Sequence, residues 1–138
     1  MAGGRIKSRS LKRNLRIKDT SEGKLFKKED GTVTFSFKYL HKDWGTNKLE
    51  AAECAAVLSA FHSRSSMKWT ELVAALRHGL GTEKINPRTL NASLPNNVTE
   101  DTTMLAMRFM GKASMVGFRR GSTFFVCYFD PRFELYRH

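Results

Sequence analysis

Residues 104–129 read MLAMRFMGKASMVGFRRGSTFFVCYF and decide the class of fold. Three runs rich in apolar and aromatic residues are separated by Gly111-Lys112 and by Arg120-Gly121-Ser122, which are both typical of hairpin turns. We therefore predict a meander of three antiparallel strands at 103–110, 114–119 and 123–129. Asp130-Pro131 then ends the last strand, because proline cannot donate to a sheet's hydrogen-bond ladder.

A fourth strand is expected upstream, at 32–40, after a turn at Asp30-Gly31. Apolar and polar residues alternate through this segment, which is the period of a strand with one buried face. The expected inward face carries Val33, Phe35, Phe37 and Tyr39.

Two helices are predicted between this strand and the meander. Asn47 and Glu50 have the spacing of a capping box, so the first helix should begin there and run to about His62. The second should begin near Ser66 and end at Gly79 or Gly81, because apolar residues recur at intervals of three and four. These apolar residues are Trp69, Leu72, Val73, Leu76 and Leu80.

The predicted fold class is therefore α+β: an antiparallel sheet of about four strands, with a two-helix hairpin on one face, preceded by a basic flexible arm. The domain boundaries are 1–30 for the arm and 31–138 for a single folded domain. The connector at 81–101 is longer than most loops in compact domains, which indicates a functional excursion or a further small element.

The charge is concentrated in the arm. The whole chain has 138 residues and a net charge of +11, whereas residues 1–28 alone hold ten basic and two acidic residues. Such an excess predicts a polyanionic partner. The arm residues expected to bind nucleic acid are Arg5, Lys7, Arg9, Lys12, Arg13, Arg16 and Lys18. A targeting peptide and a membrane-surface anchor are the competing interpretations, the second disfavoured because residues 1–25 lack Trp and Phe.

Cys54 and Cys127 sit in apolar stretches and are interpreted as buried free thiols, with a disulfide between them as the alternative. No run approaches the ~18 apolar residues of a membrane span, and the N-terminus lacks a signal-peptide core, so we expect a cytoplasmic protein. The histidines are dispersed, so neither a metal nor a cofactor is expected. His62 and His78 are interpreted as surface or capping residues. The expected strands hold no paired carboxylates.

Cations and hydroxyls gather instead toward the C-terminus, at Arg108, Arg119, Arg120 and in 132–138. A ribonuclease needs no metal if arginines stabilise the charged phosphorane and another group transfers the protons. The competing interpretation is that these are solvated hairpin and terminal residues. Residue types alone favour the second interpretation.

Several features point to a known family: the element order, MLAMRF at 104–109, VGFRR at 116–120, FFVCY at 124–128, and then Arg132 and Tyr136. In these features the chain resembles the RelE/ParE-like family of bacterial toxins. The resemblance implies metal-independent cleavage of messenger RNA on the ribosome, and a partner protein that neutralises the toxin. It implies that Arg108 and Arg119 hold phosphate and that Arg132 stabilises the transition state. Tyr136 or His138 would then move protons. Arg120 is expected to add a nucleic-acid contact.

Two hypotheses follow. The first is a toxin-type endoribonuclease, with RNA favoured over DNA as the bound nucleic acid. The second is a non-enzymatic nucleic-acid or ribonucleoprotein binder, acting as a regulator or as an inhibitor from a mobile element.

Overall fold

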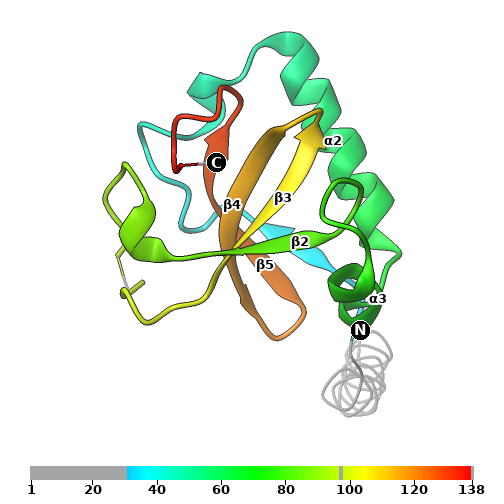
Figure 1. Cartoon of the computed structure of the whole chain (residues 1–138). Helices are drawn as coiled ribbons and strands as arrows, with labels where there is room; N and C mark the ends of the chain where they lie inside the picture. Colours follow the sequence, from blue (N-terminus) through cyan, green and yellow to red (C-terminus); the bar gives the residue numbers. More distant parts are fainter. Residues whose placement is uncertain (1–30, 97, 138) are drawn as a thin grey trace, which may run out of the picture. The chain divides into compact units, whose positions relative to one another are not determined.

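The computed structural model describes residues 31–96 and 98–137, so the expected arm at 1–30 lies outside the described residues. In Figure 1 the described elements form an α+β fold, as predicted. They are β1 (Thr34–Ser36), a 3-10 turn η1 (Thr46–Lys48), α2 (Ala51–Ser65), α3 (Trp69–Ala74), β2 (Thr82–Ile85), a 3-10 turn η2 (Pro87–Thr89), β3 (Met104–Met110), β4 (Ala113–Arg120) and β5 (Thr123–Asp130).

The predicted meander is confirmed. β3, β4 and β5 pair antiparallel, and Gly111 and Gly121 in the two hairpin turns have positive φ angles of 57° and 60°, which glycine adopts without strain. The sheet nevertheless has five strands rather than about four, in the order β1-β5-β4-β3-β2. β1 is the exception to the antiparallel pattern, because it pairs parallel to β5.

Apolar side chains cover both faces of the sheet. On one face, Val57 of α2 and Trp69 and Leu72 of α3 pack with residues of β3, β4 and β5 such as Met107 and Phe124. Figure 1 shows α2 lying alongside this part of the sheet. On the opposite face, the chain that follows β2 and the C-terminal tail supply the cover, with side chains that include Val98 and Leu135. The prediction of two helices on one face of the sheet is therefore confirmed. The cover on the opposite face was not predicted from the sequence.

β1 is shorter than the predicted strand at 32–40. The chain turns after Phe37, where the Leu40 amide donates to the Phe37 carbonyl oxygen. This turn carries Tyr39 to the face opposite the helices, against Phe118 and Phe125, while Phe35 stays on the helical face. The predicted single inward face is thus wrong beyond Phe37, because alternation in sequence cannot reveal where a strand bends.

The predicted helix start at Asn47 is also wrong. Asn47 lies in η1, and the capping box belongs to Glu50 and Glu53, with the Glu50 amide donating to Glu53 Oε1 over 2.8 Å. The predicted pair, Asn47 and Glu50, and the observed pair, Glu50 and Glu53, have the same spacing of three residues. Glu50 and Glu53 form the capping box because α2 then begins at the alanine-rich segment, where its buried face starts with Glu53 and Val57.

The second helix is much shorter than predicted, ending at Ala74 instead of Gly79 or Gly81. Its apolar periodicity does not correspond to burial, because Val73 and Leu76 are exposed at 59% and 81%. The chain folds back instead, with the Gly81 amide donating to the Leu76 carbonyl oxygen. A Cβ atom at Gly81 would collide with the Ala75 carbonyl oxygen, so glycine permits this close approach.

The long connector at 81–101 contains the small element that the sequence left undefined. Residues 82–85 form the edge strand β2, which pairs antiparallel with β3 and puts Glu83 opposite Ala106. This strand brings a carboxylate into the sheet, and Asp130 adds another at the end of β5. The sheet therefore holds acidic residues that the expected strands lacked, but Glu83 and Asp130 are paired with Ala106 and Ser114 in the sheet and not with each other.

Candidate functional site

Asp130 organises the C-terminal tail at the end of β5. Its buried carboxylate accepts hydrogen bonds from the backbone amides of Glu134, at 2.8 Å, and Leu135, at 3.2 Å. The Asn91 amide donates to the Leu135 carbonyl oxygen over 2.7 Å, which ties the tail to the connector. These bonds fold the tail back over the sheet, so that the buried Tyr136 returns to the sheet next to β3 and β4.

Tyr136 lines a small hollow on the sheet face opposite α2. Arg108 of β3 and Ser114 of β4 are directly paired in the sheet and therefore point to the same side. The hollow encloses about 10 Å³, the space of about one water molecule. Its polar lining residues are Arg77, Glu83, Arg108, Lys112, Ser114 and Tyr136. We call these six residues the Arg108 cluster.

The Arg108 cluster holds three cations and one carboxylate. Arg77 forms an ion pair of 3.1 Å with Glu83, which neutralises one positive charge. Within the described part of the chain, Arg108 and Lys112 have no carboxylate within ion-pair distance. Their charges remain available to an anion, and guanidinium groups match the geometry of a phosphate.

Tyr136 and Ser114 supply hydroxyl groups to the same place. Burial raises the pKa of the Tyr136 phenol, nearby Glu83 and Asp130 raise it further, and Ser114 and Arg108 act in the opposite direction. The phenol is therefore protonated at neutral pH and can donate a hydrogen bond. The Ser114 hydroxyl is close enough to influence that pKa, yet it is buried and forms no hydrogen bond of regular geometry with the described residues.

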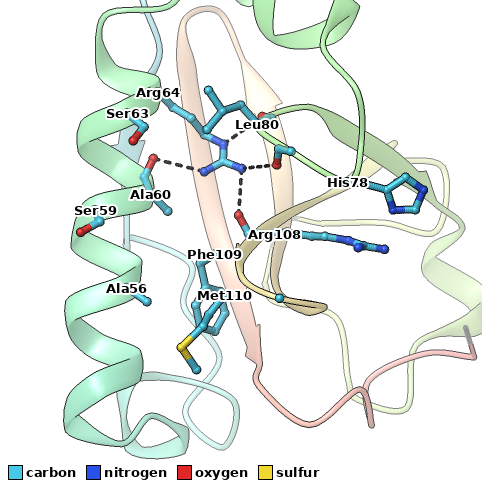
Figure 2. A pocket seen from close by; sticks show the side chains of 12 residues that line it. Ala56, Ser59, Ala60, Ser63, Arg64, His78, Leu80, Arg108, Phe109 and Met110 are labelled. Atoms are coloured by element: carbon cyan, nitrogen blue, oxygen red, sulfur yellow. Dashed lines mark hydrogen bonds between the residues drawn. The ribbon is translucent and has the colours of Figure 1, made fainter.

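Arg108 also lines a second, larger cavity of about 370 Å³ between α2 and the turn that follows α3. Figure 2 shows Arg64 reaching from α2 into this region, with His78 and Arg108 on the far side. Arg64 is fully buried and donates to the backbone carbonyl oxygens of Ala60, Leu80, Gly79 and Arg108. Burial lowers the Arg64 pKa to about 10, so the side chain stays charged at neutral pH.

The structure brings Arg108 and Tyr136 together, but the other sheet arginines lie elsewhere. Arg119 pairs with Phe124 near the opposite end of β4, five residues from Ser114 and thus about 16 Å along the strand. Its guanidinium stacks over Trp69 at 4.4 Å and its Nε donates to the Gly121 carbonyl oxygen. The predicted grouping of Arg119 with Arg108 is therefore not observed.

Arg120 and Arg132 are also outside the Arg108 cluster. Arg120 lies over the Phe118 ring at 5.2 Å, and Arg132 forms an exposed ion pair of 3.4 Å with Glu50 at the start of α2. Outside the described residues are His138 and the seven arm residues predicted to bind nucleic acid, namely Arg5, Lys7, Arg9, Lys12, Arg13, Arg16 and Lys18.

Sequence reasoning did not select Arg77, Glu83 or Lys112 as site residues. Each is a single charged residue in a turn or an edge strand, and no spacing in the sequence links them. The pairing of β2, β3 and β4 places Glu83 and the hairpin residue Lys112 near Arg108, and Arg77 joins them through its ion pair with Glu83. The two cysteines give a mixed result, since Cys127 is buried as expected but Cys54 is exposed, and both are free.

No protein-family model, curated protein or solved structure matches the chain. Within the described ranges, no helix is long and apolar enough to cross a membrane. The same residues bring no three histidine, cysteine, aspartate or glutamate side chains together in an arrangement that could hold a metal ion.

Proposed function

We propose that this protein binds RNA and cleaves its backbone at the Arg108 cluster, as a metal-independent endoribonuclease of the RelE/ParE-like toxin type. The observation that carries the proposal is the convergence of Arg77, Arg108 and Lys112 with the phenol of Tyr136 around one hollow. Stabilising the negative charge that develops on a phosphate is the main requirement of this reaction, and preorganised cations meet it.

The phosphate would bind at the mouth of the hollow, because the interior has space for only about one water molecule. Arg77 and Lys112 are exposed and can reach an RNA strand there, while the half-buried Arg108 is fixed by its strand. In the cleavage step, the 2′-oxygen attacks phosphorus and the bond to the 5′-oxygen breaks. Glu83 is the candidate acceptor of the 2′ proton, and Tyr136 is the candidate donor to the leaving 5′-oxygen.

This assignment replaces the residue roles that the family resemblance implied. Arg108 and Tyr136 keep their proposed roles, whereas Arg119 and Arg132 are engaged with Trp69 and Glu50, away from the hollow. The ribosome as the place of action, and a protein that neutralises the activity, remain proposals that rest on the resemblance.

The activity is tested by incubating the full chain with ribosome-engaged messenger RNA in excess EDTA. We expect cleavage by the parent protein, and its loss in Arg108→Ala and Tyr136→Phe at unchanged thermal stability. Arg88→Ala is the matched control, since Arg88 forms an exposed ion pair with Glu100 outside the cluster. Tight binding of RNA that stays intact would remove the enzymatic proposal.

The second candidate is a non-enzymatic RNA or ribonucleoprotein binder. It is favoured by the ion pair between Arg77 and Glu83, which already engages the Glu83 carboxylate, and by the burial of Tyr136. For this function the Arg108 cluster would hold a phosphate without breaking it. The same assay separates the two candidates. If the protein only binds RNA, neither the parent nor any variant would cleave it, and Arg108→Ala would weaken binding.

The arm is proposed to supply the sequence-independent part of the affinity. Each phosphate that a cation neutralises contributes about 0.7 to 0.9 to the slope of log affinity against log salt. Deleting residues 1–28, which carry a net charge of +8, should therefore flatten this slope and leave the melting temperature of the domain unchanged. An identical slope after deletion would show that the arm is not the main contact.

A further inference from the structure

Three aromatic rings form a continuous cluster at the β4–β5 end of the sheet, on the face opposite α2. Phe118 and Phe125 face each other across β4 and β5 and stack with ring centroids 5.1 Å apart. The half-buried Tyr39 lies against both, at 5.6 Å from Phe118 and 5.2 Å from Phe125. We call Tyr39, Phe118 and Phe125 the aromatic platform.

Cations flank the aromatic platform on both sides. The Arg120 guanidinium lies 5.2 Å from the centroid of Phe118, and the Lys38 ammonium lies 5.4 Å from that of Tyr39. Both cations are exposed, and so is Lys42 in the turn after β1. Phe118 is buried, so Tyr39 and Phe125 are the rings of the platform with exposed surface. Aromatic rings beside cations are what single-stranded nucleic acids bind to.

Tyr39 also forms one wall of an open cavity of about 480 Å³. Lys38, His41 and Lys42 line one side of this cavity, and Leu94, Pro95 and Asn96 of the connector line the other. Small-molecule pockets span about 300 to 1,000 Å³, so the cavity is large enough for one nucleobase. A base that enters it can stack on Tyr39 while its phosphate meets Lys38 or Lys42.

We propose that this cavity and the two half-buried rings of the aromatic platform, Tyr39 and Phe125, bind unpaired nucleobases of a single-stranded RNA, with the buried Phe118 packed behind them. The inference rests on the proposed function, because it adds a base-stacking contact to an RNA whose phosphate lies at the Arg108 cluster. Both sites are on one face of the sheet. Phe118 lies four residues from Ser114 along β4, about 13 Å, which a strand of a few nucleotides can span.

The test uses fluorescence anisotropy to compare the affinities of the full chain for two oligonucleotides with the same number of phosphates. These are a 2′-O-methyl oligouridine and its abasic analogue. The 2′-O-methyl groups prevent cleavage, so binding is measured alone. The parent should bind the base-bearing strand more tightly than the abasic one. Tyr39→Leu, which keeps apolar volume but removes the ring, should lose about tenfold on the base-bearing strand and nothing on the abasic strand.

Two controls isolate the ring of Tyr39. Tyr39→Phe should keep the parent's affinity, because it retains the stacking surface. Phe37→Leu should do the same, since Phe37 is 46% exposed but contacts Phe61 and Phe129 on the helical side. Equal losses on both strands, or no loss in Tyr39→Leu, would overturn the inference.

A second measurement uses the unaltered protein and does not depend on the stability of any variant. A strand carrying 4-thiouridine should photo-crosslink to peptides containing residues 38–42, 94–96 or 118–125. Crosslinks confined to 1–30 or to the Arg108 cluster would overturn the inference while leaving the proposed function standing. Absence of binding to both strands would remove both proposals.

Discussion

The Arg64 guanidinium donates a hydrogen bond of 2.8 Å to the carbonyl oxygen of Arg108 and so joins α2 to the strand that carries the central cation of the site. The same group holds the carbonyl oxygens of Gly79 and Leu80 in the turn that follows α3. Figure 2 shows these bonds radiating from the buried side chain. Arg64 therefore sets the position of Arg108 through the backbone rather than through side-chain contact.

Replacing Arg64 should destabilise the fold strongly. Arg64→Met keeps much of the apolar stem but leaves the carbonyl oxygens of Gly79, Leu80 and Arg108 without their donor. An unsatisfied buried group costs about 1–3 kcal/mol, but Gly79 and Leu80 are exposed residues whose carbonyl oxygens can bond to water, and removal of the buried charge offsets a further part. We therefore expect a loss of about 2 kcal/mol. Urea unfolding measures the loss. Arg88→Met should change stability by less than about 0.5 kcal/mol, and a similarly small effect for Arg64→Met would contradict this role.

Gly117 is required by the close pairing of β4 and β5. A Cβ atom at this position would overlap the Phe125 carbonyl oxygen, which belongs to the backbone and cannot rotate away. Gly117→Ala should therefore cost about 3 kcal/mol or more, as overpacking of a rigid site does. Gly79→Ala is the matched control, since its nearest atom would be the Leu76 carbonyl oxygen at 3.7 Å. Equal melting temperatures for the two variants would refute the argument.

The two thiols should differ in reactivity. Cys54 is exposed on α2, whereas burial raises the pKa of Cys127 to about 12 and keeps it protonated. Only the thiolate reacts with iodoacetamide, so the native protein should take up one label per chain at neutral pH and two in urea. Mass spectrometry should place the native label on Cys54. Rapid labelling of native Cys54→Ser would show that Cys127 is accessible.

Burial of Cys127 also predicts a pH dependence of stability. Its pKa rises from 9.0 in the unfolded chain to about 12 in the folded one, so the folded state retains the proton that the unfolded state loses. The stabilisation is complete below pH 9 and is lost as pH rises above it, with a slope of at most about 1.4 kcal/mol per pH unit. Urea unfolding between pH 8 and 10 should show the decline in the parent. It should be reduced in Cys127→Val, and identical slopes in the two proteins would argue against burial of the thiol.

The sequence predicted the meander well because its turns and apolar runs are local signals, and β3, β4 and β5 follow them. It predicted α3 poorly because the spacing of Val73 and Leu76 fits a helix that tertiary contacts do not form. Arg64 illustrates the same limit, since it lies in a polar Ser-Arg-Ser segment and is nevertheless fully buried.

The candidate site was predictable only in part. Arg108 and Tyr136 were selected by residue type and by family resemblance. Glu83 and Lys112 join them through strand pairing that no local pattern reveals, and Arg77 through its ion pair with Glu83. Arg119 is separated from them by the length of β4.

The central claim is that RNA is cut at the Arg108 cluster by attack of the 2′-oxygen. The most direct measurement is the single-turnover cleavage rate in EDTA, with the product ends identified, for the parent, Arg108→Ala and Arg119→Ala. We predict 2′,3′-cyclic phosphate ends from the parent, a loss of at least a hundredfold in Arg108→Ala, and a rate near the parent's in Arg119→Ala. Equal rates for the parent and Arg108→Ala, or full loss in Arg119→Ala alone, would contradict the account.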